Sequence, residues 1–173
     1  RRGEALARDI ALTDCRVVFT ESAHLPLLDG LDLPGVRVID VDSADWPEML
    51  APFAGSAPVV AQTKPDDLFM LIFTSGTSGD PKAVRCTHGK VTGPGLMLAE
   101  RFGLGPDDVV YLSMPMFHSN AIMAGWGVAL AAESGVALRR RFSASGFVTD
   151  LRKFGVTYAN YVGKPLSHIV ATP

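Results

Sequence analysis

Short apolar segments of strand length alternate with helical patterns from Asp108 onward. We expect strands at residues 109–115, 135–140 and 156–163, and helices at residues 121–133, 143–155 and 164–173. Strands that are joined by helices through short loops form a parallel sheet covered by helices on both faces. The sequence therefore predicts an α/β fold with a parallel β-sheet flanked by helices. In such folds ligands bind at the carboxyl ends of the strands.

Helix-end signals support this reading of the second half. Ser143 is a plausible N-cap for the helix at residues 143–155, and Gly155 a plausible C-cap. Farther upstream, residues 67–73 and 82–88 are strand-like, and the first of these runs looks buried. A helix is expected from about Leu96 to Arg101, with an uncertain start because glycines and a proline precede it.

The first part of the sequence predicts a second group of elements. Residues 16–20 and 36–40 are short and rich in β-branched residues, which is typical of buried strands. A helix with Leu6 and Ile10 on one face precedes them, and a short helix that Ser43 could cap follows. Residues 54–66 are rich in small residues and proline and predict a joint between subdomains.

Composition excludes several classes of partner. The formal net charge is −2, so no overall field recruits nucleic acid or an anionic membrane. The longest apolar run, at residues 121–132, is too short to cross a bilayer. Cys15 and Cys86 fit no metal-ligand spacing and are expected to behave as small buried apolar residues. Free thiols are consistent with a reducing, cytoplasmic compartment, and we predict no metal ligands.

The segment between the two upstream strands carries the strongest chemical signal. It reads TSGTSGDPK from Thr74 to Lys82. Glycines allow backbone N–H groups to converge on one point, hydroxyls add rotatable donors, and a lysine adds a positive charge. This combination predicts a cradle for phosphates, although a solvated turn is the alternative. It is not a Walker A loop, because Pro81 precedes Lys82 and Ala83 follows it.

The stretch FTSGTSGDPKAV closely resembles the phosphate-loop signature of the adenylate-forming superfamily, [YF]-T-S-G-[TS]-[TS]-G-x-P-K-[GA]-V. This superfamily contains acyl- and aryl-CoA synthetases, adenylation domains and luciferases. The resemblance implies that ATP binds through its β- and γ-phosphates to the loop, at Thr74, Ser75, Gly76, Thr77, Ser78, Gly79 and Lys82. Lys82 is also expected to be catalytic, because it would neutralise charge on the departing pyrophosphate.

A second segment, PMFHSNA, resembles the P-[LM]-[FY]-H motif of the same superfamily. The resemblance implies that Phe117 and His118 bind the acyl substrate, and that His118 is catalytic because it helps to position the carboxylate. A loop histidine beside a core aromatic ring is the alternative. The run FSASGFVTD at residues 142–150 and the later YVG at residues 161–163 look like fatty-acid transport protein and very-long-chain acyl-CoA synthetases. Gly163 is included among the expected substrate-binding residues.

The resemblance implies a two-step reaction. A long- or very-long-chain fatty carboxylate attacks ATP to give acyl-adenylate and pyrophosphate, and the coenzyme A thiol then displaces AMP. Mg²⁺ is implied, with no protein ligand assigned. We expect residues 1–173 to be an internal part of the N-terminal AMP-binding domain, with the C-terminal domain absent and the isolated fragment inactive. Peripheral membrane association is also implied, because fatty-acid transport relatives are often membrane-bound.

Two other functions remain open from the sequence. A fatty-acyl-AMP ligase would pass the adenylate to a carrier protein, and a nucleotide- or lipid-binding module would show no turnover. The small residues Ala124, Gly125 and Gly127 allow either an acyl tunnel or a tightly packed core helix. We interpret His88 as a structural residue that caps the following helix.

Overall fold

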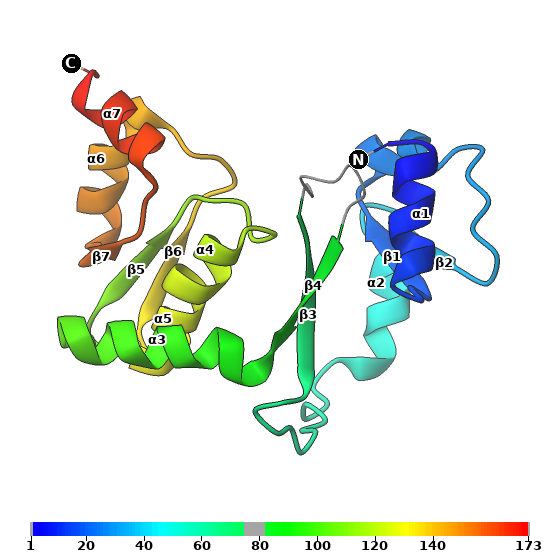
Figure 1. The fold of residues 1–173 in the computed structure, drawn as a ribbon, viewed down its shortest axis with the longest axis horizontal. Helices are drawn as coiled ribbons and strands as arrows, with labels where there is room; N and C mark the ends of the chain where they lie inside the picture. Colours follow the sequence, from blue (N-terminus) through cyan, green and yellow to red (C-terminus); the bar gives the residue numbers. More distant parts are fainter. Residues whose placement is uncertain (1, 75–81, 173) are drawn as a thin grey trace. The chain divides into compact units, whose positions relative to one another are not determined.

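The computed structural model describes residues 2–74 and 82–172, which form two compact units that divide between Ala61 and Gln62 (Figure 1). The first unit contains two helices, two strands and two short 3₁₀ helices. In chain order these are α1 (Glu4–Leu12), β1 (Val17–Thr20), η1 (Ser22–Leu27), β2 (Arg37–Asp40), α2 (Asp45–Leu50) and η2 (Ala51–Phe53). The strands β1 and β2 pair in parallel, with Val17 opposite Arg37 and Thr20 opposite Asp40.

The two predicted strands of this unit are confirmed, but the prediction that they are buried is wrong. Among their apolar residues Ile39 is buried, whereas Val17, Phe19 and Val38 are exposed. A sheet of two strands buries little of each strand without a layer packed on both faces. The predicted Ser43 cap is also wrong. Helix α2 has Ala44 at its N-cap position, and no side chain makes a cap hydrogen bond.

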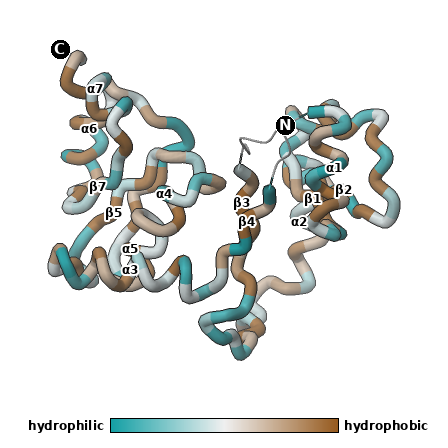
Figure 2. Tube along the Cα trace, viewed as in Figure 1, coloured by the Kyte–Doolittle hydropathy of each residue, from teal (hydrophilic) through white to brown (hydrophobic). Residues whose placement is uncertain are grey.

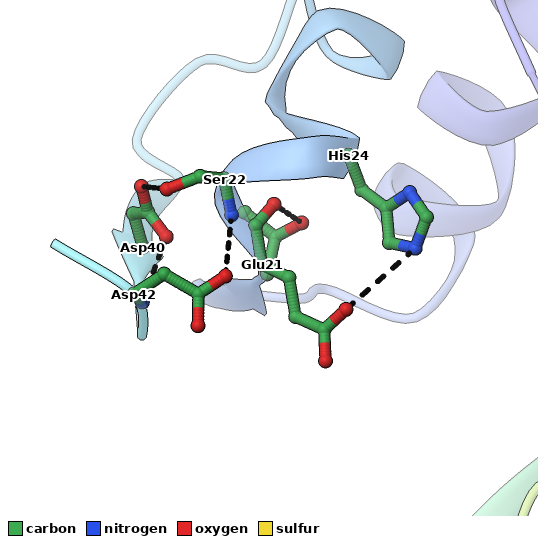
Figure 3. A network of polar contacts seen from close by, with 6 residues as sticks. Glu21, Ser22, His24, Asp40 and Asp42 are labelled. Carbon is green, nitrogen blue, oxygen red and sulfur yellow. Dashed lines mark hydrogen bonds and ion pairs between the residues drawn. The ribbon is translucent and has the colours of Figure 1, made fainter. Parts of the chain in front are cut away.

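A polar network joins the carboxyl ends of β1 and β2 (Figure 3). The Ser22 hydroxyl donates to Asp40 Oδ2 at 2.5 Å, and the Ser22 backbone N–H donates to Asp42 Oδ2 at 3.1 Å. The Asp42 N–H donates in turn to Asp40 Oδ1 at 3.0 Å. These bonds satisfy backbone groups that leave the ladder where the strands end, so the network stabilises the turn into η1.

The second unit begins with a hairpin of two antiparallel strands, β3 (Leu68–Thr74) and β4 (Lys82–Thr87). Both strands were predicted, and Figure 2 shows that β3 is predominantly hydrophobic. The expectation that the first one is buried is wrong, since Leu68, Phe69 and Phe73 are exposed. The exposed residues lie at the two ends of the strand, whereas the central Met70, Leu71 and Ile72 are half-buried.

The predicted parallel sheet is confirmed downstream. It contains β5 (Val109–Leu112), β6 (Gly135–Leu138) and β7 (Tyr158–Ala159), in the order β6-β5-β7. Both neighbours pair in parallel with β5. Val110 and Leu112 join a core cluster with Val128, Ala129 and Ala132. Successive strand side chains point to opposite faces, so Tyr111 lies on the other side, where its ring contacts Phe147.

Helices cover both faces of this sheet (Figure 1). One face carries α3 (His88–Phe102) and a helix built from α4 (Ser119–Ala121), the π-helical segment η3 (Ile122–Trp126) and α5 (Gly127–Ala132). The other face carries α6 (Ala144–Phe154), and α7 (Gly163–Val170) packs against α6. The predicted caps of α6 are confirmed: Ser143 Oγ accepts from Gly146 N, and Gly155 adopts a left-handed conformation.

Helix α3 begins at His88, well before the predicted start near Leu96. Thr87 caps it, accepting from Lys90 N at 3.3 Å, so the role that we assigned to His88 belongs to its neighbour. The helix runs through Pro94 and Gly95, the residues that made its start uncertain. A Cβ at Gly95 would lie 2.6 Å from the Gly127 carbonyl carbon, so α3 and α5 touch backbone to backbone. This tertiary contact outweighs the weak helix propensity of the segment.

Replacing Gly95 with alanine should therefore destabilise the protein. The added methyl group forces α3 and α5 apart, and overpacking of this kind costs about 1–3 kcal/mol. Chemical denaturation would show the loss as a lower midpoint. Gly93 is the matched control, because it is in the same helix and a Cβ there meets nothing within 4 Å. Gly93→Ala should leave the midpoint unchanged or raise it, and equal losses in both variants would contradict the close contact.

Candidate functional site

The hairpin holds the two ends of the predicted phosphate loop opposite each other. Thr74 is the last residue of β3 and Lys82 the first of β4, and the two are paired in the antiparallel register. Ser75, Gly76, Thr77, Ser78 and Gly79 lie outside the described residues, as does Pro81. Thr74 and Lys82 are both exposed, so the hydroxyl and the ammonium group are accessible to a ligand in solvent.

The second predicted segment follows β5. The chain leaves the strand through Ser113 and turns at Pro115, whose carbonyl accepts from His118 N at 3.0 Å. His118 is then the N-cap residue of α4. Its ring lies 4.7 Å from that of Phe117, centroid to centroid, and Phe117 is 70% exposed. The exposed ring argues against the alternative of a core aromatic residue at this position.

His118 lines a cavity of about 170 Å³ at the carboxyl ends of β5 and β7. This is the edge at which the sequence predicts a ligand. The walls are mostly apolar with a few polar groups, as in small-molecule sites. They are formed by Ser113, Met114, Pro115, His118, Phe142, Phe147, Asn160, Tyr161, Pro165 and Ile169.

The cavity brings together only some of the predicted residues. His118 is in its wall, whereas Thr74, Lys82, Phe117 and Gly163 are not among the lining residues. Gly163 begins α7 and so supports the helix that supplies Pro165 and Ile169.

Asn160, Phe142 and Phe147 line the cavity but were not among the site residues predicted from the sequence. No local signal marks Asn160, because its place in the site depends on its bond to Asn120, 40 residues earlier in the chain.

A polar triad of buried Tyr111, buried Asp150 and exposed Arg139 supports the wall that Phe147 provides. The Tyr111 hydroxyl donates to Asp150 Oδ2 at 2.9 Å, and Arg139 Nε lies 2.9 Å from the same oxygen. Tyr111 is buried, and its ring meets that of Phe147 edge-on at 5.5 Å. Burial, with the Asp150 carboxylate adding to it, raises the pKa of the Tyr111 hydroxyl to about 12. The triad links β5, β6 and α6 beneath the cavity.

The small residues of the helix after His118 mainly permit close packing. A Cβ at Gly125 would collide with Leu112 Cδ2, and one at Gly127 would lie 3.1 Å from the carbonyl oxygen of Val91. These contacts favour the packed-core alternative at both positions. Gly127 and Trp126 also line a second apolar cavity of about 380 Å³, between α3, α5 and the start of β3.

Within residues 2–74 and 82–172, no group of three or more His, Cys, Asp or Glu side chains is placed to hold a metal ion. In the same part of the chain, no helix is long and apolar enough to span a membrane. Of the two cysteines, Cys86 is buried as expected and Cys15 is partly buried.

Comparison with known proteins identifies the family. The family model described as "AMP-binding enzyme" matches residues 2–173. The chain belongs to this AMP-binding enzyme family. The match confirms the resemblance that the phosphate-loop motif indicated.

Curated relatives from the family match over a third of their length or less. The chain is 54% identical over 173 residues to a medium/long-chain-fatty-acid–CoA ligase, FadD17, of Mycobacterium marinum, covering 100% of this chain and 33% of the relative. It is 42% identical over 181 residues to a steroid-22-oyl-CoA synthetase of Rhodococcus jostii, covering 100% and 32%. A long-chain fatty acid transport protein 2 of Rattus norvegicus is 41% identical over 102 residues, covering 59% and 16%.

Solved structures confirm the α/β fold. The ATP-bound structure of MatB from Rhodopseudomonas palustris superposes with a TM-score of 0.81 at 20% identity, covering 97% of this chain and 34% of that chain. At this identity the likeness concerns the fold.

The tyrosine triad predicts a pH dependence of stability. Between pH 10 and about pH 12 the folded state keeps the Tyr111 proton that the unfolded state releases, so this contribution to stability is lost as pH rises. Tyr111→Phe should flatten the decline of the denaturation midpoint over that range. It should also lower the midpoint at pH 7, because Asp150 loses a hydrogen bond worth about 1 kcal/mol.

Two other tyrosines provide the comparison. Burial also raises the pKa of Tyr158, so part of the decline should remain in the Tyr111 variant. Tyr161 is exposed, and Tyr161→Phe should follow the parent curve. A Tyr111→Phe curve parallel to the parent between pH 10 and 12 would contradict the pKa assignment.

Proposed function

We propose that the whole protein is an ATP-dependent fatty-acid–CoA ligase acting on a medium- or long-chain acid. The observation that carries the proposal is the 54% identity across the full chain to a medium/long-chain-fatty-acid–CoA ligase. The hairpin supports it, because a phosphate-loop signature is anchored there between paired residues Thr74 and Lys82. The chain spans 33% of that relative, so the activity is proposed for the whole protein.

In the first step, an oxygen of the fatty carboxylate attacks the α-phosphorus of ATP, and the bond to the bridging oxygen breaks to release pyrophosphate. Lys82 places its ammonium group on the leaving phosphates, and the Thr74 hydroxyl donates to them. Such transfers depend on positioning and on neutralising charge more than on covalent participation by the protein. In the second step, the coenzyme A sulfur attacks the acyl carbonyl and AMP leaves.

His118 acts at the acyl end of the reaction. Its imidazole lies in the wall of the 170 Å³ cavity, where it can orient the carboxylate of the substrate. The exposed ring of Phe117 lies beside this imidazole. The apolar walls contributed by Phe142, Phe147 and Ile169 suit the alkyl portion nearest the carboxylate.

Mg²⁺ would add positive charge at the phosphate oxygens when bound. Among the described residues, no group of three or more His, Cys, Asp or Glu side chains is placed to hold this ion.

Pyrophosphate exchange and product analysis test the function of the whole protein. Exchange of pyrophosphate into ATP that requires palmitate supports adenylation, and AMP formation that also requires coenzyme A supports the ligase. Adenylate that accumulates without thioester would favour transfer to a carrier protein. A strong preference for a steroid carboxylic acid over palmitate would move the substrate class toward that of the Rhodococcus relative.

Lys82→Ala should weaken ATP binding by about tenfold or more, because the triphosphate loses a charge-assisted contact of roughly 1.5–3 kcal/mol. Calorimetric titration with ATP would measure the change. Lys153→Ala is the matched control, since this residue is on α6 with its ammonium 5.1 Å from the centre of the Phe154 ring. Equal ATP affinity in the parent and the Lys82 variant would refute the phosphate-loop assignment.

A further inference from the structure

Tyr158 in strand β7 and Asn160, the residue that follows the strand, both contact the helix after His118. The strand pairs with β5 so that Tyr158 is opposite Val110 and Ala159 opposite Tyr111. Asn160 follows β7 directly, and its side chain bonds to the same helix as the side chain of Tyr158. This helix is built from α4, η3 and α5.

Both side chains bond to the helix. The Tyr158 hydroxyl donates to the Ala124 carbonyl at 3.0 Å, within the π-helical segment. Asn160 Nδ2 donates to the Asn120 carbonyl at 3.2 Å and to Asn120 Oδ1 at 2.5 Å. A backbone carbonyl can only accept, so the bond to it fixes which end of the Asn160 amide faces Asn120. The helix is therefore attached to β7 at two points about one turn apart.

Gly125 leaves space for this arrangement. A Cβ at this position would lie 3.2 Å from Asn160 Oδ1, and it would also collide with Leu112 Cδ2. A larger residue would displace the amide or move the helix away from the sheet. Three residues that the proposed reaction does not use, Asn160, Asn120 and Gly125, are thus fitted to one another.

The attachment point is close to His118 in both sequence and space. Asn120 is two residues after His118, which is the N-cap of the same short helix. His118 and Asn160 line the same cavity of about 170 Å³. The Asn160 side chain is neutral, so it ties the turn without placing a charge where a fatty carboxylate would bind.

We infer that Asn160 is a positioning residue that holds His118 in the acyl cavity by bonding to Asn120. The effect on turnover rests on the proposed function, whereas the effect on His118 itself does not. Thr74 and Lys82, the described ends of the phosphate loop, are not among the residues that line this cavity, so the exchange of Asn160 leaves their side chains in place.

A kinetic cycle tests the coupling in the whole protein. Asn160→Leu, which keeps a similar volume and removes both hydrogen bonds, should lower palmitate-dependent pyrophosphate exchange about tenfold while the Kd for ATP stays unchanged. In a His118→Ala background, the same substitution should cause little further loss, because residues that act as a unit are not additive. An equal loss in both backgrounds, or none in the parent, overturns the inference.

A spectroscopic measurement decides the inference without any activity. The chain has four histidines, and NMR of histidine labelled in the ring can follow each one. Asn160→Leu should shift or broaden the His118 signal and leave that of His24, in the first unit, unchanged. Asn120→Ala, which retains the backbone acceptor, should produce a smaller change in the same direction. An unmoved His118 signal in the folded variants overturns the inference.

The exchange assay and the His118 signal together distinguish a failure of the proposed function from a failure of the positioning role. If the parent shows no pyrophosphate exchange with any acid tested, the proposed function fails and the His118 signal alone decides the positioning role. If the parent is active and Asn160→Leu changes stability without changing exchange or the His118 signal, the amide has only a structural role.

Discussion

The alternation of side chains along β5 organises the second unit. Val110 and Leu112 enter the core beneath α5, while Tyr111 between them faces α6 and reaches Asp150. One strand of four residues therefore fixes helices on both faces of the sheet. Because its carboxyl end leads directly into the Pro115 turn, its position also determines where His118 lies.

Three helical glycines, Gly95, Gly125 and Gly127, contribute to packing because they lack a side chain. Gly95 and Gly127 bring two helix backbones into contact, and Gly125 admits Leu112 and Asn160 beside the helix. A pattern of small residues in an apolar helix has two physical interpretations, an open volume or a close approach. Only the position of the neighbouring backbone distinguishes them, and a single sequence does not contain that information.

The sequence predicted the elements well and their surroundings poorly. The order of strands and helices after Asp108 follows from apolar periodicity, and the caps of α6 at Ser143 and Gly155 follow from local chemistry. The start of α3 was predicted too late, because glycines and a proline in the segment disfavour a helix locally. The tertiary contact at Gly95 stabilises the helix through Pro94. The predicted burial of β1, β2 and β3 was too high. An apolar strand sequence indicates that burial would be favourable, but it does not indicate whether a second layer of structure covers the strand. The phosphate-loop motif and His118 were found from short motifs, whereas Asn160 depends on a contact between segments that are 40 residues apart.

The π-helical segment Ile122–Trp126 has a consequence for how this helix can vary. A π turn holds about one residue more than an α turn. It therefore changes the direction in which side chains point between the part of the helix that follows His118 and the part that packs on α3. Deleting one residue there would restore regular α-helical spacing but rotate one part against the other by roughly 100°. The fit of Gly127 to α3 and the bonds of Asn120 and Ala124 to β7 could not then both persist. Within these five residues, chain length is therefore constrained in addition to the residue identity at Gly125.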